Sequence, residues 1–317
     1  MSANGQVIAA GSLPGSLSVS RDGGATWTSG NGAPNGERWI SVDMSASGQY
    51  IVGVGFDGMM YRSSDSGATF TRIDSTIATL TTNATQAYEG VTISDDGQRI
   101  VAAIQNGRIY VSSNGGTTFT AATGAPAAPW RAVDSSADGS VVVAAHHNGE
   151  VYISTNGGTS FTLLPVTVGG NAIADGWYRL ALSRDGNTLA LAGNQQWGTG
   201  GPTTGIYVGR RAAGAWTFNQ GSNVVGNYGA LAMSANGDVI VASLYMPTTA
   251  TGASARVLRS VNRGVSFTQI TAPTAAPANW RAIAIDANAT RLALGNGDFA
   301  ANAPGRLYTS TGSVTGN

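Results

Sequence analysis

The residues that could do chemistry in this chain are few. Its 317 residues hold 17 acidic and 17 basic side chains, two histidines and no cysteine, and all the basic residues are arginines. A chain without lysine cannot form a Schiff base, and one without cysteine has neither a thiolate nucleophile nor a disulfide. Equal numbers of opposite charges also remove the positive field that nonspecific nucleic-acid binding needs. We therefore expect no nucleic-acid partner.

The remaining candidates for catalysis are scattered. Hydrolysis of a glycosidic bond needs two carboxyl groups about 5 to 9.5 Å apart, but the sequence shows no evident pair. The only histidines are His146 and His147, and neighbours on a strand point to opposite faces, which argues against a shared metal ion. We expect no metal and no cofactor. If the chain is an enzyme, the candidate catalytic residues are Asp57, Asp298 and His147.

The elements that would position these residues follow from an internal repeat. The motif Ser/Asp-x-x-Gly, or a close variant, returns every 42 to 52 residues, which is typical of propeller blades. Copies begin at Ser2, Ser45, Ser94, Ser136, Ser183, Ser234 and Asp286. We predict one domain, 1–317, with units of approximately 1–35, 36–84, 85–127, 128–173, 174–224, 225–276 and 277–317.

Each unit contains four short apolar segments separated by Gly, Asn, Asp and Ser. In the fourth unit they are residues 130–136, 140–145, 150–154 and 159–163. Their length, their β-branched and aromatic residues and the absence of a sustained 3.6-residue period predict four-stranded antiparallel sheets. An aromatic residue opens the first segment of six units, and it could either pack between sheets or line a channel. These residues are Trp39, Tyr88, Trp130, Trp177, Tyr228 and Trp280.

A second motif lies between the third and fourth segments. It reads Ser20-Arg-Asp22-Gly-Gly24-Ala-Thr26-Trp27 in the first unit, and it returns around Asp65, Asn114, Asn156 and Asn262. It resembles the Asp-box, or bacterial neuraminidase repeat, whose pattern is Ser-x-Asp-x-Gly-x-Thr-Trp. In such a turn the Asx side chain bonds backbone amides, and glycine supplies a positive φ.

The resemblance covers essentially the whole chain. It implies an all-β fold, a seven-bladed β-propeller of four-stranded antiparallel blades, with structural Asp-box turns on the face opposite the ligand site. The copy at residues 209–216 is degenerate and the last copy is truncated. We expect short terminal strands to close the ring, and an unpaired terminal edge strand could support self-association.

Candidate ligand-binding residues lie in insertions of units five to seven. Blades two to four have tight turns at the corresponding place, and long loops on a rigid scaffold are where binding residues concentrate. Their amides, carboxylate and aromatic rings suit neutral polar ligands such as sugars. The insertions offer Gln195, Gln196, Trp197, Tyr245, Asp298 and Phe299, and nearby strands and turns add His146, His147, Arg131, Arg179 and Arg281.

Three functions remain open. We expect a non-enzymatic propeller that binds a glycan or a protein surface through the loop-rich face of blades five to seven. The first alternative is a carbohydrate-active hydrolase or lyase, and the second is a self-assembling surface or fibre protein. The resemblance includes sialidases, but their catalytic pattern does not map onto this sequence. We expect an extracytoplasmic or secreted protein without membrane insertion, and any signal peptide is absent from this sequence.

Overall fold

The computed structural model describes residues 1–77, 87–173, 175–193, 205–224, 226–245, 256–270, 279–297 and 306–310. In these residues the chain forms β-strands and one short 3-10 helix, η1 (Asp74–Thr76). A search of the same residues finds no helix with the length and apolarity to cross a membrane. The chain divides into unit 1, residues 1–146 and 151–164, and unit 2, residues 147–150 and 165–317.

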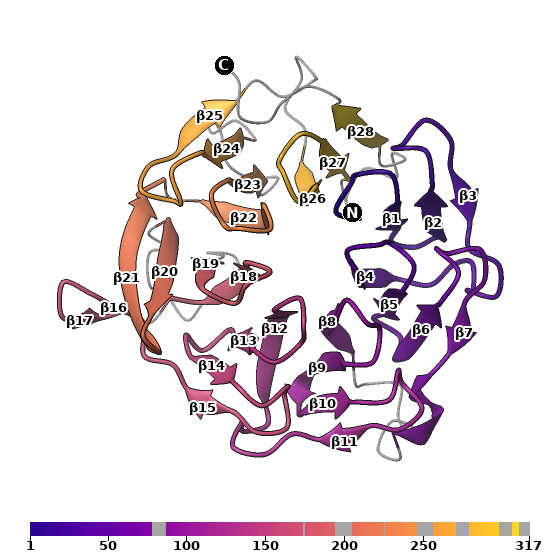
Figure 1. Ribbon diagram of the computed structural model, residues 1–317, viewed down its shortest axis with the longest axis horizontal. Coiled ribbons are helices and arrows are strands. Elements are labelled where there is room, and N and C mark those ends of the chain that lie inside the picture. The colour runs from indigo at the N-terminus through magenta and orange to yellow at the C-terminus, as the bar shows by residue number, and fades with distance from the viewer. Residues whose placement is uncertain are drawn as a thin grey trace. The chain divides into compact units, whose positions relative to one another are not determined.

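Unit 1 consists of antiparallel sheets in which strands follow one another in sequence order (Figure 1). The first two sheets contain β1 (Ile8–Gly11), β2 (Leu17–Ser20) and β3 (Thr28–Ser29), then β4 (Trp39–Met44), β5 (Ile51–Gly55), β6 (Met59–Ser63) and β7 (Thr71–Arg72). The next strands are β8 (Tyr88–Ile93), β9 (Ile100–Gly107), β10 (Ile109–Ser112), β11 (Thr120–Ala121), β12 (Ala128–Ser135), β13 (Val142–His146), β14 (Val151–Ser154) and β15 (Thr162–Leu163). The groups β8–β11 and β12–β15 are connected because β9 also pairs with the start of β12.

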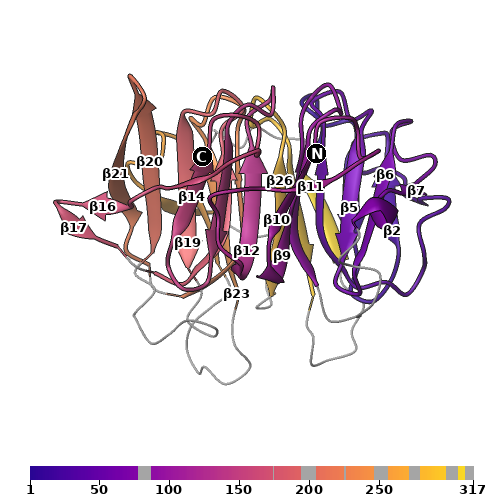
Figure 2. The same ribbon diagram turned by 90° about the horizontal axis from the view of Figure 1, so that it is seen from below.

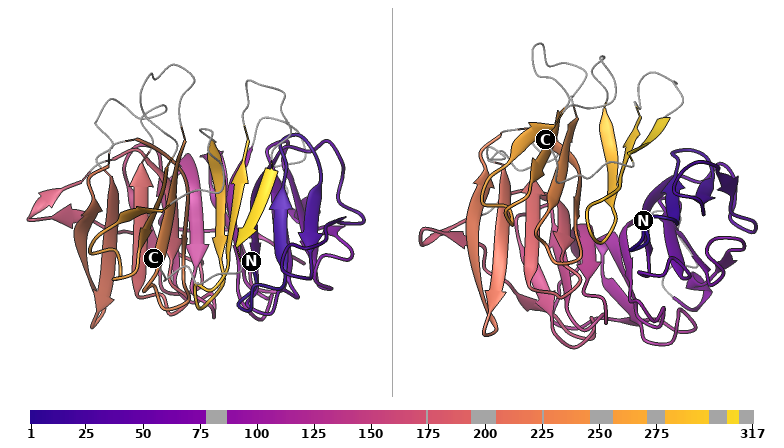
Figure 3. Two further views of the ribbon diagram at one scale, coloured as in Figure 1. Left: turned by 90° about the horizontal axis from the view of Figure 1, so that it is seen from above. Right: turned by 45° about the horizontal axis from the view of Figure 1, so that its top comes forward.

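Unit 2 repeats the same order. It contains β18 (Trp177–Leu182), β19 (Thr188–Gly193), β20 (Ile206–Ala212) and β21 (Ala215–Ser222), then β22 (Asn227–Met233), β23 (Ile240–Tyr245), β24 (Arg256–Ser260) and β25 (Thr268–Ile270). The last sheet holds β26 (Trp280–Ile285), β27 (Leu292–Asn296) and β28 (Arg306–Ser310), the yellow strands of Figure 3. A separate hairpin, β16 (Thr167–Val168) and β17 (Asn171–Ala172), precedes β18 in the chain and projects beside β21 (Figure 2).

Each hydrophobic core lies between two neighbouring sheets. The side chains of Val54 and Met60 from one sheet, for example, join Tyr88 and Ile100 from the next in one buried cluster. A four-stranded sheet has two faces and cannot bury either by itself, so stacking on its neighbours supplies the burial. The same arrangement recurs in unit 2, where β19 and β20 pack against β22 and β23.

The aromatic residues that open the innermost strands belong to these cores. Trp130, Trp177 and Tyr228 are fully buried, and Trp39, the most accessible of the six, is only 4% exposed. The indole nitrogens of Trp130 and Trp177 donate hydrogen bonds to the Gly107 and Gly149 carbonyls, at 3.1 and 2.9 Å. The packing interpretation of these residues is therefore confirmed, and the alternative that they line a channel is wrong.

Five turns between third and outermost strands share one hydrogen-bonding pattern. The Ser20 hydroxyl accepts a bond from the Gly24 amide (2.8 Å) and donates to the Asp22 carboxylate (2.8 Å). That carboxylate also accepts the Thr26 amide (2.9 Å), and Gly24 has φ +96°. The matching serines are Ser63, Ser112, Ser154 and Ser260.

The central residue of these turns can be Asp or Asn because the last hydrogen bond reverses. The Thr26 hydroxyl donates to Asp22, whereas the Asn114 amide nitrogen donates to the Thr118 hydroxyl. The hydroxyl and amide bonds of Thr26 lower the pKa of Asp22 to about 2, and those of Thr69 do the same for Asp65. Both carboxylates are consequently ionised at neutral pH.

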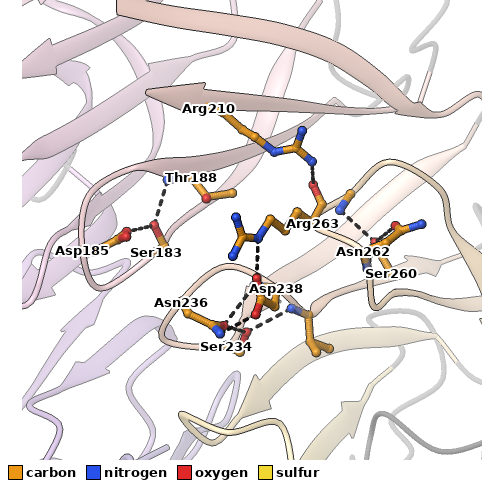
Figure 4. A network of polar contacts seen from close by, with 12 residues as sticks. Ser183, Asp185, Thr188, Arg210, Ser234, Asn236, Asp238, Ser260, Asn262 and Arg263 are labelled. Carbon is orange, nitrogen blue, oxygen red and sulfur yellow. Dashed lines mark hydrogen bonds and ion pairs between the residues drawn. The ribbon is translucent and has the colours of Figure 1, made fainter. Parts of the chain in front are cut away.

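These turns are also bonded to the turns between first and second strands. In unit 1 the Gly115 amide donates to the Gln98 carbonyl (2.8 Å), and the Asp95 amide donates to the Ala137 carbonyl in the next sheet (2.8 Å). In unit 2 the Arg263 guanidinium contacts Asp238 while the Arg210 guanidinium donates to the Arg263 carbonyl (Figure 4). This end of the strands therefore has a structural role.

The first and last sheets each show three strands within the described residues. The Ser2 turn directly precedes β1, so the first sheet begins with the counterpart of a second strand. Residues 311–317, which we expected to close the ring, lie outside the described residues, and closure by terminal strands stays a prediction.

Candidate functional site

The opposite end of the innermost strands contains a repeated β-bulge. Just after the opening aromatic residue, the register between first and second strand shifts by one residue in six strand pairs of the described chain. A bulge re-aims a side chain and is common beside active sites. The extra residues are Ile40, Glu89, Arg131, Tyr178, Gly229 and Arg281. Their side chains vary from glycine and isoleucine to glutamate, tyrosine and arginine, whereas the residue before each of them is always Trp or Tyr.

In unit 1, two of these bulge residues form an ion pair. The Arg131 guanidinium lies 2.6 Å from the Glu89 carboxylate, and the two side chains are 13% and 8% exposed. With its amide oriented so that the oxygen faces the guanidinium, Gln105 accepts from both terminal nitrogens of Arg131 at 3.2 and 3.0 Å. Three sequence-distant segments thus hold one planar cation in a fixed orientation.

The innermost strands β4, β8 and β12 are also joined by polar side chains. The Asp43 carboxylate accepts the Thr92 hydroxyl (3.0 Å) and the Ile93 amide (2.8 Å) from β8. Thr92 and Ser135 on β12 share a further hydrogen bond of 2.8 Å. Since these bonds cross between sheets, they fix the relative positions of the strands that present Glu89 and Arg131.

Asp57, a sequence candidate for catalysis, lies on the surface of unit 1. Its carboxylate forms a salt bridge with Arg38, whose guanidinium stacks over the Phe56 ring 4.3 Å from its centroid. The hydrogen bond from Arg38 lowers the pKa of Asp57 below its ordinary value. A lowered pKa disfavours the protonated form that a general acid needs.

The two histidines belong to different units. His146, the last residue of β13, is 2% exposed and packs edge-on against the Trp130 ring at 5.0 Å. His147 follows the strand and is 8% exposed. A ligand could therefore reach His146 only by displacing core side chains. Throughout the described ranges, no group of three or more His, Asp or Glu side chains is arranged to hold a metal ion.

In unit 2 the corresponding strand ends carry arginines and a tyrosine. The Arg179 guanidinium lies 4.1 Å from the centroid of the Tyr178 ring and donates to the Gly229 carbonyl on β22 at 2.6 Å. The Arg281 guanidinium donates to the Gly297 carbonyl (3.3 Å). Asp175 is 5% exposed, and its charge, after desolvation, contributes to the raised pKa of the buried Tyr228 hydroxyl. Asp175 is thus a buried carboxylate.

Most residues of the insertions in units five to seven lie outside the described part of the chain. Tyr245 is the last residue of β23, and its side chain is not among those described. The other insertion candidates lie outside the described residues, and their roles stay predictions. They are Gln195, Gln196, Trp197, Asp298 and Phe299.

Gln105 and Tyr178 were not among the residues predicted from the sequence. Nothing in the local sequence indicates that Gln105 meets a side chain 26 positions away. Tyr178 directly precedes Arg179, and an aromatic–Arg neighbour pair within a bulged strand start is the signal that could have singled it out. The described strand ends thus hold an oriented cation paired with a carboxylate in unit 1, and two arginines and an aromatic ring in unit 2.

Comparisons with known proteins show the fold. No family model matches the chain, and no curated protein matches it either. Among solved structures, a GH74 enzyme of Niastella koreensis superimposes with a TM-score of 0.71 and 18% identity, covering 99% of this chain and 52% of its own. The chain therefore spans about half the length of that enzyme.

Two shorter proteins match over most of their length. YCF48 bound to D1 peptide has a TM-score of 0.64 and 16% identity, with 93% of this chain and 88% of that chain covered. The Cps50 (Swd1) β-propeller domain of Myceliophthora thermophila has a TM-score of 0.65 and 12% identity, covering 93% and 92%. At such identities the likeness concerns the fold alone: the chain is an all-β protein with a β-propeller fold, built mostly from four-stranded antiparallel sheets.

Proposed function

We propose that this chain is a non-enzymatic, extracytoplasmic β-propeller that binds a protein or glycan surface at the bulged ends of its innermost strands. The observation that carries the proposal is the fixed orientation of Arg131 between Glu89 and Gln105. A guanidinium whose position is already set loses little further freedom on binding a carboxylate or carbonyl. The insertion residues of unit 2, Trp197 and Tyr245 included, are separate candidates for contact with the ligand.

The finer description of the fold belongs to the same proposal. Seven copies of the first-turn motif support seven blades, and the serine–Asx turns have the hydrogen bonds expected of Asp-boxes. Because these turns recur with the same bonding in five sheets, a structural role accounts for them better than a catalytic one. We therefore assign ligand binding to the opposite ends of the innermost strands, where the bulge residues vary in type.

A protein ligand is favoured over a glycan by the chemistry of the described residues. A solved neighbour of this fold is bound to a peptide. Arg131, Arg179 and Arg281 offer charged donors suited to carboxylates and backbone carbonyls. Sugar binding would depend on the amides and rings of the insertions. The hydrolase alternative rests on likeness to GH74 enzymes, while Glu89 is paired with Arg131 and Asp57 with Arg38.

The proposal is tested by screening the full chain on a peptide array and a glycan array. The hits are then measured with a double variant, Glu89→Gln with Arg131→Gln, which removes both charges and leaves neither buried alone. We expect affinity to fall about tenfold or more. Arg21→Gln, at the opposite strand ends, is the matched control and should bind normally. Trp197→Ala and Tyr245→Ala test the insertions. Equal affinity of the double variant and the control would refute the site.

A further inference from the structure

The strand β21 differs from every other outermost strand that the structure describes. The outermost strands β3, β7, β11, β15 and β25 have two or three residues, whereas β21 has eight. Short edge strands limit pairing with other chains, and a long one exposes a row of backbone donors and acceptors. The sheet order of these residues ends at β21, and the β16–β17 hairpin lies beside β21 without pairing with it, so β21 has no hydrogen-bonded strand partner on its outer side within the described residues (Figure 1).

The length of β21 follows from the turn that precedes it. The serine–Asx turn is replaced here by a two-residue turn, Ala213 (φ +49°) and Gly214 (φ +85°), which joins β20 and β21 in a regular hairpin. Two positive φ values in succession are typical of type I′ hairpin turns, which continue the ladder on both strands. The degenerate copy of the motif thus creates an edge that the intact copies lack.

The register shows which backbone groups point outward. The Arg211 amide donates to the Asn187 carbonyl, away from β21, so Arg211 and its partner Trp216 are not a hydrogen-bonded pair. In an antiparallel ladder such pairs alternate with hydrogen-bonded ones. The backbone groups of Trp216 and Phe218 therefore face the outer side of the strand.

The hairpin that ends in this edge carries positive charge. The strands β20 and β21 contain Arg210 and Arg211 and no acidic residue. Arg211 lies directly across the hairpin from Trp216, and within the described part of the chain its guanidinium makes no hydrogen bond or ion pair. Its charge could therefore attract a carboxylate beside the outer edge of β21.

We propose that the outer edge of β21 is a docking site for an extended acidic peptide, which adds to the sheet as a further antiparallel or parallel strand. Backbone bonds to Trp216 and Phe218 would supply the pairing, and Arg211 would select carboxylate side chains. A second copy of this chain is the less favourable occupant because it would bring the same arginines to the interface. This site is separate from the bulged strand ends of the proposed function.

Binding is tested with fluorescein-labelled peptides roughly eight residues long, the span of an ordinary strand. One peptide alternates glutamate with valine, the second glutamine with valine, and the third lysine with valine. Fluorescence anisotropy on the full chain should show the acidic peptide binding about threefold or more tighter than the glutamine peptide. Arg211→Gln should weaken the acidic peptide by about twofold to fivefold. Equal binding of all three peptides would overturn the proposal.

The pairing itself is tested with two variants at one position. Trp216→Ala and Trp216→Pro both remove the indole, but only proline removes the outward amide, and proline is tolerated on an edge strand. We expect Trp216→Pro to bind the acidic peptide about threefold to tenfold more weakly than Trp216→Ala. Circular dichroism and thermal unfolding establish that both variants are folded. If the circular dichroism spectrum of Trp216→Pro is not native, amide hydrogen exchange on the wild-type chain replaces the comparison.

Hydrogen exchange provides an independent readout. The acidic peptide should slow exchange of the Trp216 and Phe218 amides in the wild-type chain. Protection confined to another segment, or equal affinity of the two Trp216 variants, would contradict strand addition. A sulfated polysaccharide serves as a competitor. If it displaces the peptide and binds Trp216→Ala and Trp216→Pro equally, the site is a general anion-binding surface. Concentration-dependent dimerisation abolished by Trp216→Pro would identify a second copy as the occupant, and either result rejects the proposal.

Discussion

Units 1 and 2 use the same strand order but hold it together differently. Unit 1 has four serine–Asx turns with the full set of hydrogen bonds, and Asp43, Thr92 and Ser135 link its innermost strands. Within the described residues, unit 2 has one such turn, at Ser260, and alanines stand at the strand positions equivalent to Asp43 and Thr92. These are Ala181, Ala232 and Ala284.

The difference between the units shows which interactions are common to the whole fold and which occur in only some of its sheets. Both units have buried aromatic residues at the strand starts and cores between sheets. The turn motif and the polar links are absent from part of unit 2, where a hairpin turn and arginine contacts take their place. Intersheet packing is therefore the shared requirement, and side-chain hydrogen bonding is a local addition.

The largest effect should come from the shared element. Trp130→Ala in unit 1 and Trp280→Ala in unit 2 each remove a side chain that is at most 1% exposed. We expect each to lower the free energy of unfolding by about 3 to 5 kcal/mol, measured by urea denaturation. A loss below about 1 kcal/mol in only one unit would show that the units do not depend equally on this packing.

A smaller effect should distinguish the units. Asp43→Ala gives unit 1 the alanine that unit 2 has, but it leaves the Thr92 hydroxyl and the Ile93 amide without their acceptor. We expect a loss of about 2 to 3 kcal/mol in the free energy of unfolding. The double variant Asp43→Ala with Thr92→Ala should lose less than the sum of the two single changes. Strict additivity would argue against a coupled network.

The serine of the turn motif should matter equally in both units. Ser112→Ala and Ser260→Ala each leave a glycine amide, that of Gly116 or Gly264, without its acceptor. We expect each change to cost about 1 to 2 kcal/mol of unfolding free energy. Thr120→Ala, in the exposed strand β11, is the control and should stay within about 0.5 kcal/mol of wild type. A tolerated Ser112→Ala would mean that the motif is not structural.

The smallest effect is the pH dependence that two of the turns add to unit 1. The folded pKa values of Asp22 and Asp65, about 2, lie below the ordinary value of 3.8. Their contribution to stability is therefore present above about pH 4 and is lost as the pH falls toward 2. Asp22→Asn with Asp65→Asn should flatten this decline, because Asn serves in the other turns. The check is the urea midpoint of unfolding, measured at pH 6 and at pH 3 for wild type and for the double variant. If the midpoint falls between these pH values by the same amount in both proteins, the prediction is contradicted.

The repeating part of the fold could be predicted from sequence because its causes are local. A turn serine bonds a residue two to five positions away, and strand alternation is visible within one segment. The hairpin β16–β17 was missed although Gly169-Gly170 between short apolar runs is a hairpin signal. The bulges and the pairing of Glu89 with Arg131, 42 positions apart, depend on how sheets stack and leave no local trace.

The most direct test of the account compares two variants at opposite ends of the strands. Ligands from the peptide and glycan arrays are titrated against Ser112→Ala and against Glu89→Gln with Arg131→Gln, and urea unfolding is measured on the same samples. The account predicts that Ser112→Ala lowers stability and binds like wild type, and that the double variant is folded and loses affinity about tenfold or more. Loss of affinity in Ser112→Ala, with normal binding by the folded double variant, would contradict the assignment of structure to one end and recognition to the other.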